Sequence, residues 1–207
     1  MTRRHLAAIL LVVASLHAPA AAAEPAATAE PTSVAKSSGH EFSLTGSILL
    51  LNVEADSARY NLLELTGEWR YGDKVGLAAI IGGGRMLVED EGTGYQLGVF
   101  DLGGQAYYCL LGDFDHGFQL GVESVFVALR GEDRYNGSVT ATLGGISLAP
   151  FLGYKLALRS GFTVIVQAGG GLFVSTTHAS HAASETEVDE QAAVLVPLVN
   201  MNMGWSF

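Results

Sequence analysis

Apolar and polar residues alternate along most of the chain from Glu41 to its last residue. The final segment, VNMNMGWSF (199–207), has an apolar residue at every second position and small or amidic residues between them. Because successive side chains of a β-strand point to opposite sides, a period of two predicts a strand with one apolar face. The same pattern predicts strands over 41–51, 59–71, 75–83, 97–111, 118–129, 143–158, 162–174 and 193–207.

Short and long joins alternate between the predicted strands. The short joins carry Gly, Asp or Ser, as hairpin turns do, whereas the long joins are mostly polar. Short joins therefore share one end of the sheet and long joins share the other. Because this asymmetry with an even number of strands is typical of bacterial outer-membrane barrels, we expect an all-β fold, an eight-stranded antiparallel up-and-down transmembrane β-barrel. The short joins are 72–74, 112–117 and 159–161, and the long joins are 84–96, 130–142 and 175–192.

The aromatic residues on the apolar faces lie close to the short turns or to the ends of the predicted barrel. The core of a soluble protein gives no reason for aromatic rings to gather at one height of a barrel, whereas such rings concentrate at a membrane interface. We therefore expect the apolar faces to contact lipid and these rings to form a girdle at the periplasmic rim. The predicted girdle contains Phe42, Trp69, Tyr71, Tyr108, Phe118, Tyr154, Phe162, Trp205 and Phe207. Within 97–111 the alternation changes phase near Phe100 and Asp101, which predicts a β-bulge there.

A secreted lipocalin-like barrel shares the period of two but turns its apolar face inward around a ligand. Its difficulty is volume, since side chains already fill the interior of an eight-stranded barrel. Two Trp and several Tyr or Phe at one end would overfill it.

The N-terminal residues indicate where the protein is located, and the composition limits its partners. Residues 1–23 combine a basic start, an apolar run and small residues before the predicted cleavage point, as a secretory signal peptide does. Residues 24–40 predict a disordered periplasmic leader, and 41–207 the outer-membrane barrel. Cys109 is the single cysteine, so the chain forms no internal disulfide. A formal net charge of −10 argues against nucleic acid as a partner.

The chain end resembles the C-terminal assembly signal of outer-membrane proteins, with Val199, Met201, Met203, Trp205 and Phe207 at the alternating positions. The segment FLGYKLALRSGFTVIVQAGGGLFV (151–174) resembles the last-but-one hairpin of small OmpA/OmpX/OmpW-like barrels. This resemblance covers 41–207. It implies that the outer-membrane assembly machinery reads the final strand. The sequence departs from OmpA because no peptidoglycan-binding domain follows the barrel, so no cell-wall tether is implied.

Charged residues on the inward faces are the most informative candidates for a site. An ion inside a narrow barrel must be paired and hydrogen-bonded, or it costs several kcal/mol. We therefore expect a lumen ion-pair network in which Arg70 and Lys155 serve three carboxylates. Such a network is either a plug that holds the barrel or a gated path for protons or ions. Its predicted members are Glu64, Glu68, Arg70, Glu123 and Lys155.

Other motifs give weaker evidence for a functional site. The glycines of 80–86 and 168–173 lack the following helix of a phosphate loop, so we expect them to make space for inward residues such as Tyr107 and Phe151. In the join 177–190, His178 and His181 lie near several carboxylates, but their spacing fits no defined metal site. Ser180 beside His181 suggests hydrolase chemistry without a strand to fix it. We expect no catalytic residue, metal or cofactor.

Three functional hypotheses follow. The first is a monomeric structural or surface-interaction barrel in contact with outer-membrane lipid and lipopolysaccharide, its lumen plugged and its loops facing outward. The second is a narrow pore or transporter for small solutes. The third is a lipid A-modifying enzyme. The lumen distinguishes the first two, because substituting its carboxylates alters conductance in a pore and only stability in a plug.

Overall fold

The computed structural model describes residues 39–47, 53–55, 58–90, 93–133, 139–181 and 186–207. The predicted signal peptide and most of the predicted leader lie outside these residues. Every element of regular secondary structure assigned in the described part is a β-strand. Among the described residues there is no helix long and apolar enough to cross a membrane. The strands are β1 (Phe42–Ser47), β2 (Val53–Ala55), β3 (Ala58–Arg70), β4 (Val75–Asp90), β5 (Thr93–Gly112), β6 (His116–Asp133), β7 (Val139–Ala157), β8 (Phe162–His181) and β9 (Thr186–Ser206).

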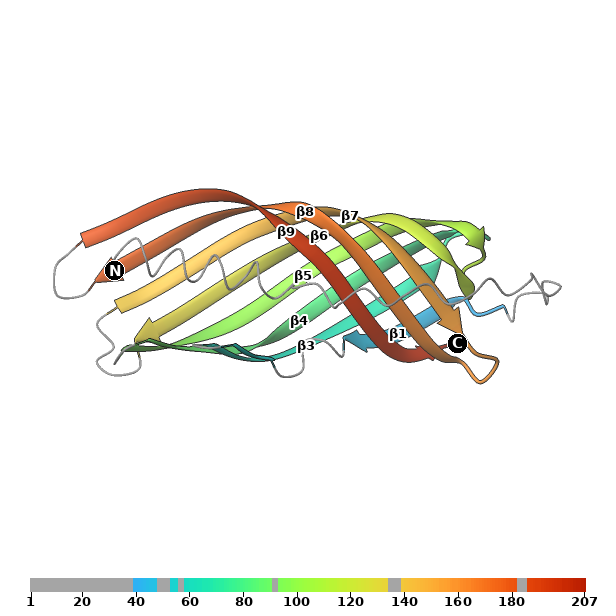
Figure 1. Cartoon of the computed structure of the whole chain (residues 1–207), viewed down its shortest axis with the longest axis horizontal. Coiled ribbons are helices and arrows are strands. Elements are labelled where there is room, and N and C mark those ends of the chain that lie inside the picture. The colour runs from blue at the N-terminus through green and yellow to red at the C-terminus, as the bar shows by residue number, and fades with distance from the viewer. Residues whose placement is uncertain (1–38, 48–52, 56–57, 91–92, 134–138, 182–185) are drawn as a thin grey trace.

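These strands form one antiparallel sheet that closes into a ring (Figure 1). From β3 to β9 each strand pairs with the next, and β1 closes the ring by pairing with both β9 and β3. Because β1 and β2 both pair with β3 and occupy one position in the ring, the barrel has eight strand positions. The prediction of an eight-stranded antiparallel up-and-down barrel is confirmed.

The strands run much further toward the long-join end than predicted. The predicted loops 84–96, 130–142 and 175–192 are mostly paired backbone, since β4 continues to Asp90, β5 begins at Thr93, and β8 continues to His181. The ladder joins backbone groups, so polar side chains do not end it. The predicted first strand 41–51 is described only as far as Ser47.

The predicted bulge near Phe100 and Asp101 is wrong. The β5 register against both β4 and β6 is continuous there, and it shifts instead between Cys109 and Leu111. Phe100 faces outward and Asp101 inward without a change of phase. The apolar pattern slips because the lumen itself becomes apolar at this height, where Leu97 is buried in the interior. A real interruption occurs between β7 and β8, whose ladder lacks rungs at Pro150, a residue without a backbone N–H.

The outward face carries a broad apolar band. Leu63, Leu120, Leu152 and Leu172 are all exposed, so the apolar faces turn outward and the lipocalin-like alternative is excluded for this fold. The band of β6 runs from Phe118 to Ala128, close to the roughly 9–11 residues with which a tilted strand crosses a bilayer.

Polar side chains replace this band along one row of the sheet. Neighbouring strands pair at these positions, so the change occurs together around most of the barrel. The row consists of Asn61, Arg85, Arg130, Thr142 and His178, with Gly98 between the two arginines.

The inward face has two halves of different chemistry. The half near the short turns is polar and includes Glu68, Lys155, Gln119 and Thr163, all fully or almost fully buried. The other half is apolar, with Met86, Leu129, Phe173 and other buried side chains. Sequence alternation marks the polar half readily. It leaves the apolar half ambiguous around Phe173, where the outward neighbours Leu172 and Val174 are apolar as well.

Inward glycines make room for the largest lumen side chains. A Cβ on Gly121 would lie 2.5 Å from the Phe151 ring and 2.8 Å from the Ala106 carbonyl oxygen, whereas a Cβ on Gly144 would meet nothing within 4 Å. Gly76 gives Tyr107 space in the same way. The predicted use of glycine as lumen space therefore holds opposite Tyr107 and Phe151, although Gly76 and Gly121 lie outside the two predicted Gly-rich runs.

We expect Gly121→Ala to lower the free energy of unfolding by about 1–3 kcal/mol, because the added methyl group overpacks the lumen against backbone. Gly144→Ala is the matched control, a strand glycine with free space, and should change it by about 0.5 kcal/mol or less. Equilibrium urea unfolding in lipid vesicles measures both. Equal effects of the two substitutions would contradict the packing argument.

Candidate functional site

The turn between β5 and β6 inserts a phenylalanine into the barrel end. Asp113 Oδ1 accepts hydrogen bonds from the backbone N–H groups of Asp115 and His116, each at 2.9 Å. The Asp115 carbonyl oxygen accepts another from Ala157 on β7 at 2.8 Å. These bonds fold the turn inward, and Phe114 is completely buried. The short-turn end of the lumen is therefore filled by a side chain from a turn.

Two cations contact this ring and hold carboxylates beside it: the buried Lys155 and the partly exposed Arg70, whose guanidinium carbon lies 5.4 Å from the ring centre. Lys155 Nζ lies 3.6 Å from the centre of the Phe114 ring and 2.7 Å from Glu68 Oε2. It also donates to Ser43 Oγ at 2.7 Å, and Tyr107 donates its hydroxyl hydrogen to Glu68 at 3.0 Å. Since Lys155 and Glu68 are both almost fully buried, their charges depend on these partners.

Arg70 pairs with a residue that the sequence analysis missed. Its Nη2 lies 3.6 Å from Asp115 Oδ2, and His40 Nδ1 lies 3.2 Å from Asp115 Oδ1. Asp115 belongs to a predicted turn and His40 to the predicted leader, so neither was expected in the lumen. We call the cluster of Glu68, Arg70, Phe114, Asp115 and Lys155 the end plug.

A layer of amides lies beside the end plug. Gln105 and Gln167 exchange hydrogen bonds through their side-chain amides, at 3.1 Å in each direction. Glu123 Oε2 accepts from Gln105 at 2.6 Å and from Asn200 at 3.2 Å. Four strands are thereby joined across the lumen by neutral donors. Glu123 is held by amides and has no ion pair with a described lysine or arginine.

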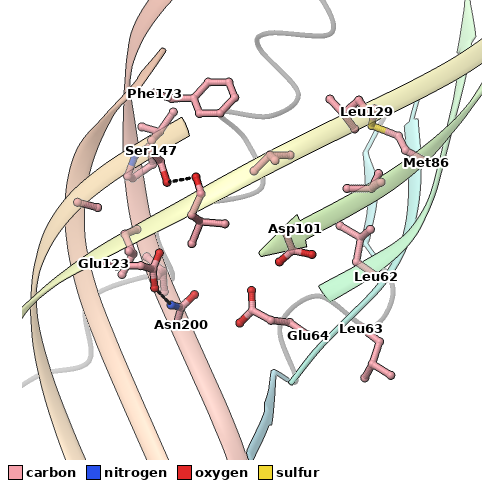
Figure 2. Close-up of a pocket in the computed structure, with 18 residues that line it drawn as sticks. Leu62, Leu63, Glu64, Met86, Asp101, Glu123, Leu129, Ser147, Phe173 and Asn200 are labelled. Atoms are coloured by element: carbon pink, nitrogen blue, oxygen red, sulfur yellow. Dashed lines mark hydrogen bonds between the residues drawn. The ribbon is translucent and has the colours of Figure 1, made fainter. Parts of the chain in front are cut away.

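The predicted network is therefore only partly assembled. Glu68 and Lys155 meet as an ion pair, but the expectation that Arg70 and Lys155 also serve Glu64 and Glu123 is wrong. Arg70 lies against Asp115, and Glu64 faces Asp101, which was not among the predicted members (Figure 2). The alternation of 97–111 carries the missing signal, because a continuous phase turns Asp101 inward.

A cavity of about 110 Å³ lies in the lumen beyond the amide layer (Figure 2). One side of it is formed by carboxyl groups of Glu64, Asp101 and Glu123. Glu64 and Asp101 point toward one another, within hydrogen-bonding reach. Glu64 Oε1 is inaccessible to solvent and has no hydrogen-bond partner. The remaining walls are mostly apolar, and they include Leu62, Met86, Val125, Leu129, Phe173 and Val196.

The predicted aromatic girdle lies on the outer wall at the short-turn end. Trp69 and Trp205 are each about half exposed, at 47% and 52%. Ring pairs link neighbouring strands: Phe42 with Trp69 at 5.4 Å, Phe118 with Tyr154 at 4.9 Å, and Phe162 with Trp205 at 5.4 Å between centroids. Phe207 also stacks on Phe42 at 6.4 Å. The remaining girdle members, Tyr71 and Tyr108, are exposed as well.

The residues considered for other chemistry lie elsewhere. The backbone of His178, Ser180 and His181 belongs to strand β8. The prediction that these residues lie in a loop is therefore wrong. The described residues contain no group of three His, Cys, Asp or Glu side chains placed to hold a metal ion. Neither protein-family models nor curated proteins match the chain in sequence comparisons.

We expect Lys155→Met to lower the free energy of unfolding by about 3–5 kcal/mol, because it leaves the buried Glu68 carboxylate without its cation. Adding Glu68→Gln should recover part of the loss. Lys74→Met, at an exposed turn lysine, is the control and should cost about 1 kcal/mol or less. Urea unfolding of the refolded variants checks the set. A Lys155→Met variant as stable as the control would show that the pair holds nothing together.

Proposed function

We propose that this protein is an integral barrel of the bacterial outer membrane with a structural and surface-interaction role, closed to solute passage by its end plug. The observation that carries the proposal is the combination of an apolar outer band with a lumen filled at one end. Exposed apolar surface of this extent on a soluble monomer would drive aggregation, whereas lipid covers it without penalty.

The orientation follows from the same features. The aromatic girdle, the short turns and the C-terminus share one end, which we assign to the periplasm. The polar row that contains Arg85 and Arg130 then faces the outer leaflet, where lipopolysaccharide phosphates lie. The resemblance of residues 199–207 to an assembly signal supports recognition by the outer-membrane assembly machinery, and residues 1–23 support export. We propose a monomer, because β1 closes the ring within one chain.

The pore alternative is disfavoured by the filled lumen. A solute entering from the loop end meets the amide layer of Gln105, Gln167 and Glu123 and then the end plug. Phe114 and Phe151 are among the most deeply buried side chains of the chain. No arrangement in the described residues favours the lipid A-modifying alternative.

The two tryptophans provide a test of insertion, since the chain contains only Trp69 and Trp205. In vesicles, lipids brominated near the headgroup should quench their fluorescence more than lipids brominated near the chain ends, because both lie in the girdle. Trp205→Phe isolates Trp69 as a control. Strong quenching by aqueous acrylamide with none by brominated lipid would overturn the proposal.

A planar-bilayer recording tests the closed lumen. We expect folded protein, verified by a boiled-versus-unboiled gel shift, to be electrically silent. Discrete channel steps that vanish in Glu123→Gln would instead establish the lumen as a pathway and favour the pore. A Glu41→Gln variant, altered outside the lumen layers, is the control for that substitution.

A further inference from the structure

The lumen cavity differs from the rest of the interior in its unbalanced charge. Each buried carboxylate of the end plug has a cation beside it: Lys155 for Glu68, and Arg70 for Asp115. In the described part of the chain, no lysine or arginine forms an ion pair with Glu64, Asp101 or Glu123. The cavity therefore concentrates acidic oxygens where the protein supplies no positive charge.

One of these oxygens is left without any partner. Glu123 accepts two amide hydrogen bonds, and Asp101 faces Glu64, but Glu64 Oε1 is buried and unpaired. A buried acceptor without a donor is destabilising, and more so when it is charged. A donor that arrives with a ligand would remove this cost. The carboxyl pair also lies on the cavity wall itself (Figure 2).

The opposite walls select the rest of such a ligand. Met86, Leu129 and Phe173 are buried and apolar, and they offer no hydrogen bond. Small-molecule sites commonly combine apolar walls with a few convergent polar groups in this way. A hard metal ion fits poorly, because the carboxyl groups of the described residues are not gathered in threes around one point, as its oxygen coordination requires. A negatively charged ligand would be repelled by the carboxylates.

We propose that this cavity binds a small organic cation, with its ammonium group on Glu64 and Asp101 and its apolar body against the hydrophobic walls. The volume limits the body: a protein cavity of about 150 Å³ accommodates benzene, and this one measures about 110 Å³. Because this volume is smaller than one that accommodates benzene, the site suits an amine carrying a short alkyl chain. The proposal goes beyond the surface role above and does not depend on it.

Butylamine and 1-butanol form a matched pair of probes, because they have nearly the same shape and only the amine is cationic at neutral pH. Refolded protein in micelles is titrated with each, and the amide resonances of Leu62, Gly82 and Ser147 are followed by NMR. Gly82 is a suitable reporter because its backbone lies against the Asp101 carboxylate. We expect saturable shifts, with butylamine binding roughly tenfold or more tighter than the alcohol.

Two variants separate charge from space. Glu64→Gln combined with Asp101→Asn keeps the shape and removes the charge, so the preference for the amine should disappear. Val127→Phe fills the apolar part of the cavity with the carboxylates intact, so saturable shifts from both probes should be lost. Asp73→Asn, at an exposed turn, is the control and should behave as the original protein.

Equal affinity for the two probes in the unaltered protein overturns the proposal, as does retention of the preference in the charge-removing variant. Shifts that never saturate in a protein showing the folded gel shift also overturn it, because they report only partition into micelles. If the charge-removing variant fails to fold, Val127→Phe decides: saturable binding of butylamine to that variant places the amine outside the cavity. A silent, lipid-embedded barrel without saturable binding would reject this inference and leave the proposed function standing.

Discussion

Closure of the backbone ladder is the constraint on which the rest of this structure depends. A sheet edge exposes unpaired N–H and C=O groups, and a barrel removes both edges by pairing the first strand with the last. Here the short strand β1 makes that join, with Phe42 opposite Trp69 on one side and Leu44 opposite Trp205 on the other. Once the ring is closed, the period of two assigns every strand residue to the lumen or to the outer wall. The apolar band and the buried charges both follow from this assignment.

Alternation made the wall predictable and the lumen only partly so. The outward positions of Leu63 and Trp69, and the inward positions of Glu68 and Lys155, follow from period two alone. Phe114 and Asp115 do not, because a turn residue has no alternation, and the hydrogen bonds of Asp113 and of Ala157 direct that turn inward. Asp101 was missed for a different reason: an apolar lumen above it made a regular strand resemble a bulged one. Strand length was underestimated because polar side chains were taken for loops.

The two halves of the lumen differ: one end is packed and ion-paired, and the cavity lies further along the barrel axis. At the short-turn end, Lys155 and Glu68 satisfy each other, and the aromatic ring of Phe114 excludes water from their charges. Toward the other end the walls become apolar, and the carboxyl groups of Glu64, Asp101 and Glu123 have no ion pair with a described lysine or arginine. A barrel that needed only to be rigid could have been filled with hydrocarbon throughout. The acidic cavity is thus the part of the interior that packing does not explain.

The long strands determine what another molecule meets at the long-join end of the barrel. Paired backbone extends beyond the polar row of Arg85 and Arg130, and the segments between described strands at that end are 56–57, 91–92, 134–138 and 182–185. A partner approaching this end would meet strands whose positions are set before contact, so recognition would cost little ordering entropy. Such a surface favours partners whose shape already fits it. Residues inserted within the paired region would disrupt the strand pairing. Sequence variation between related barrels would then be tolerated at outward side chains and resisted in the spacing along each strand.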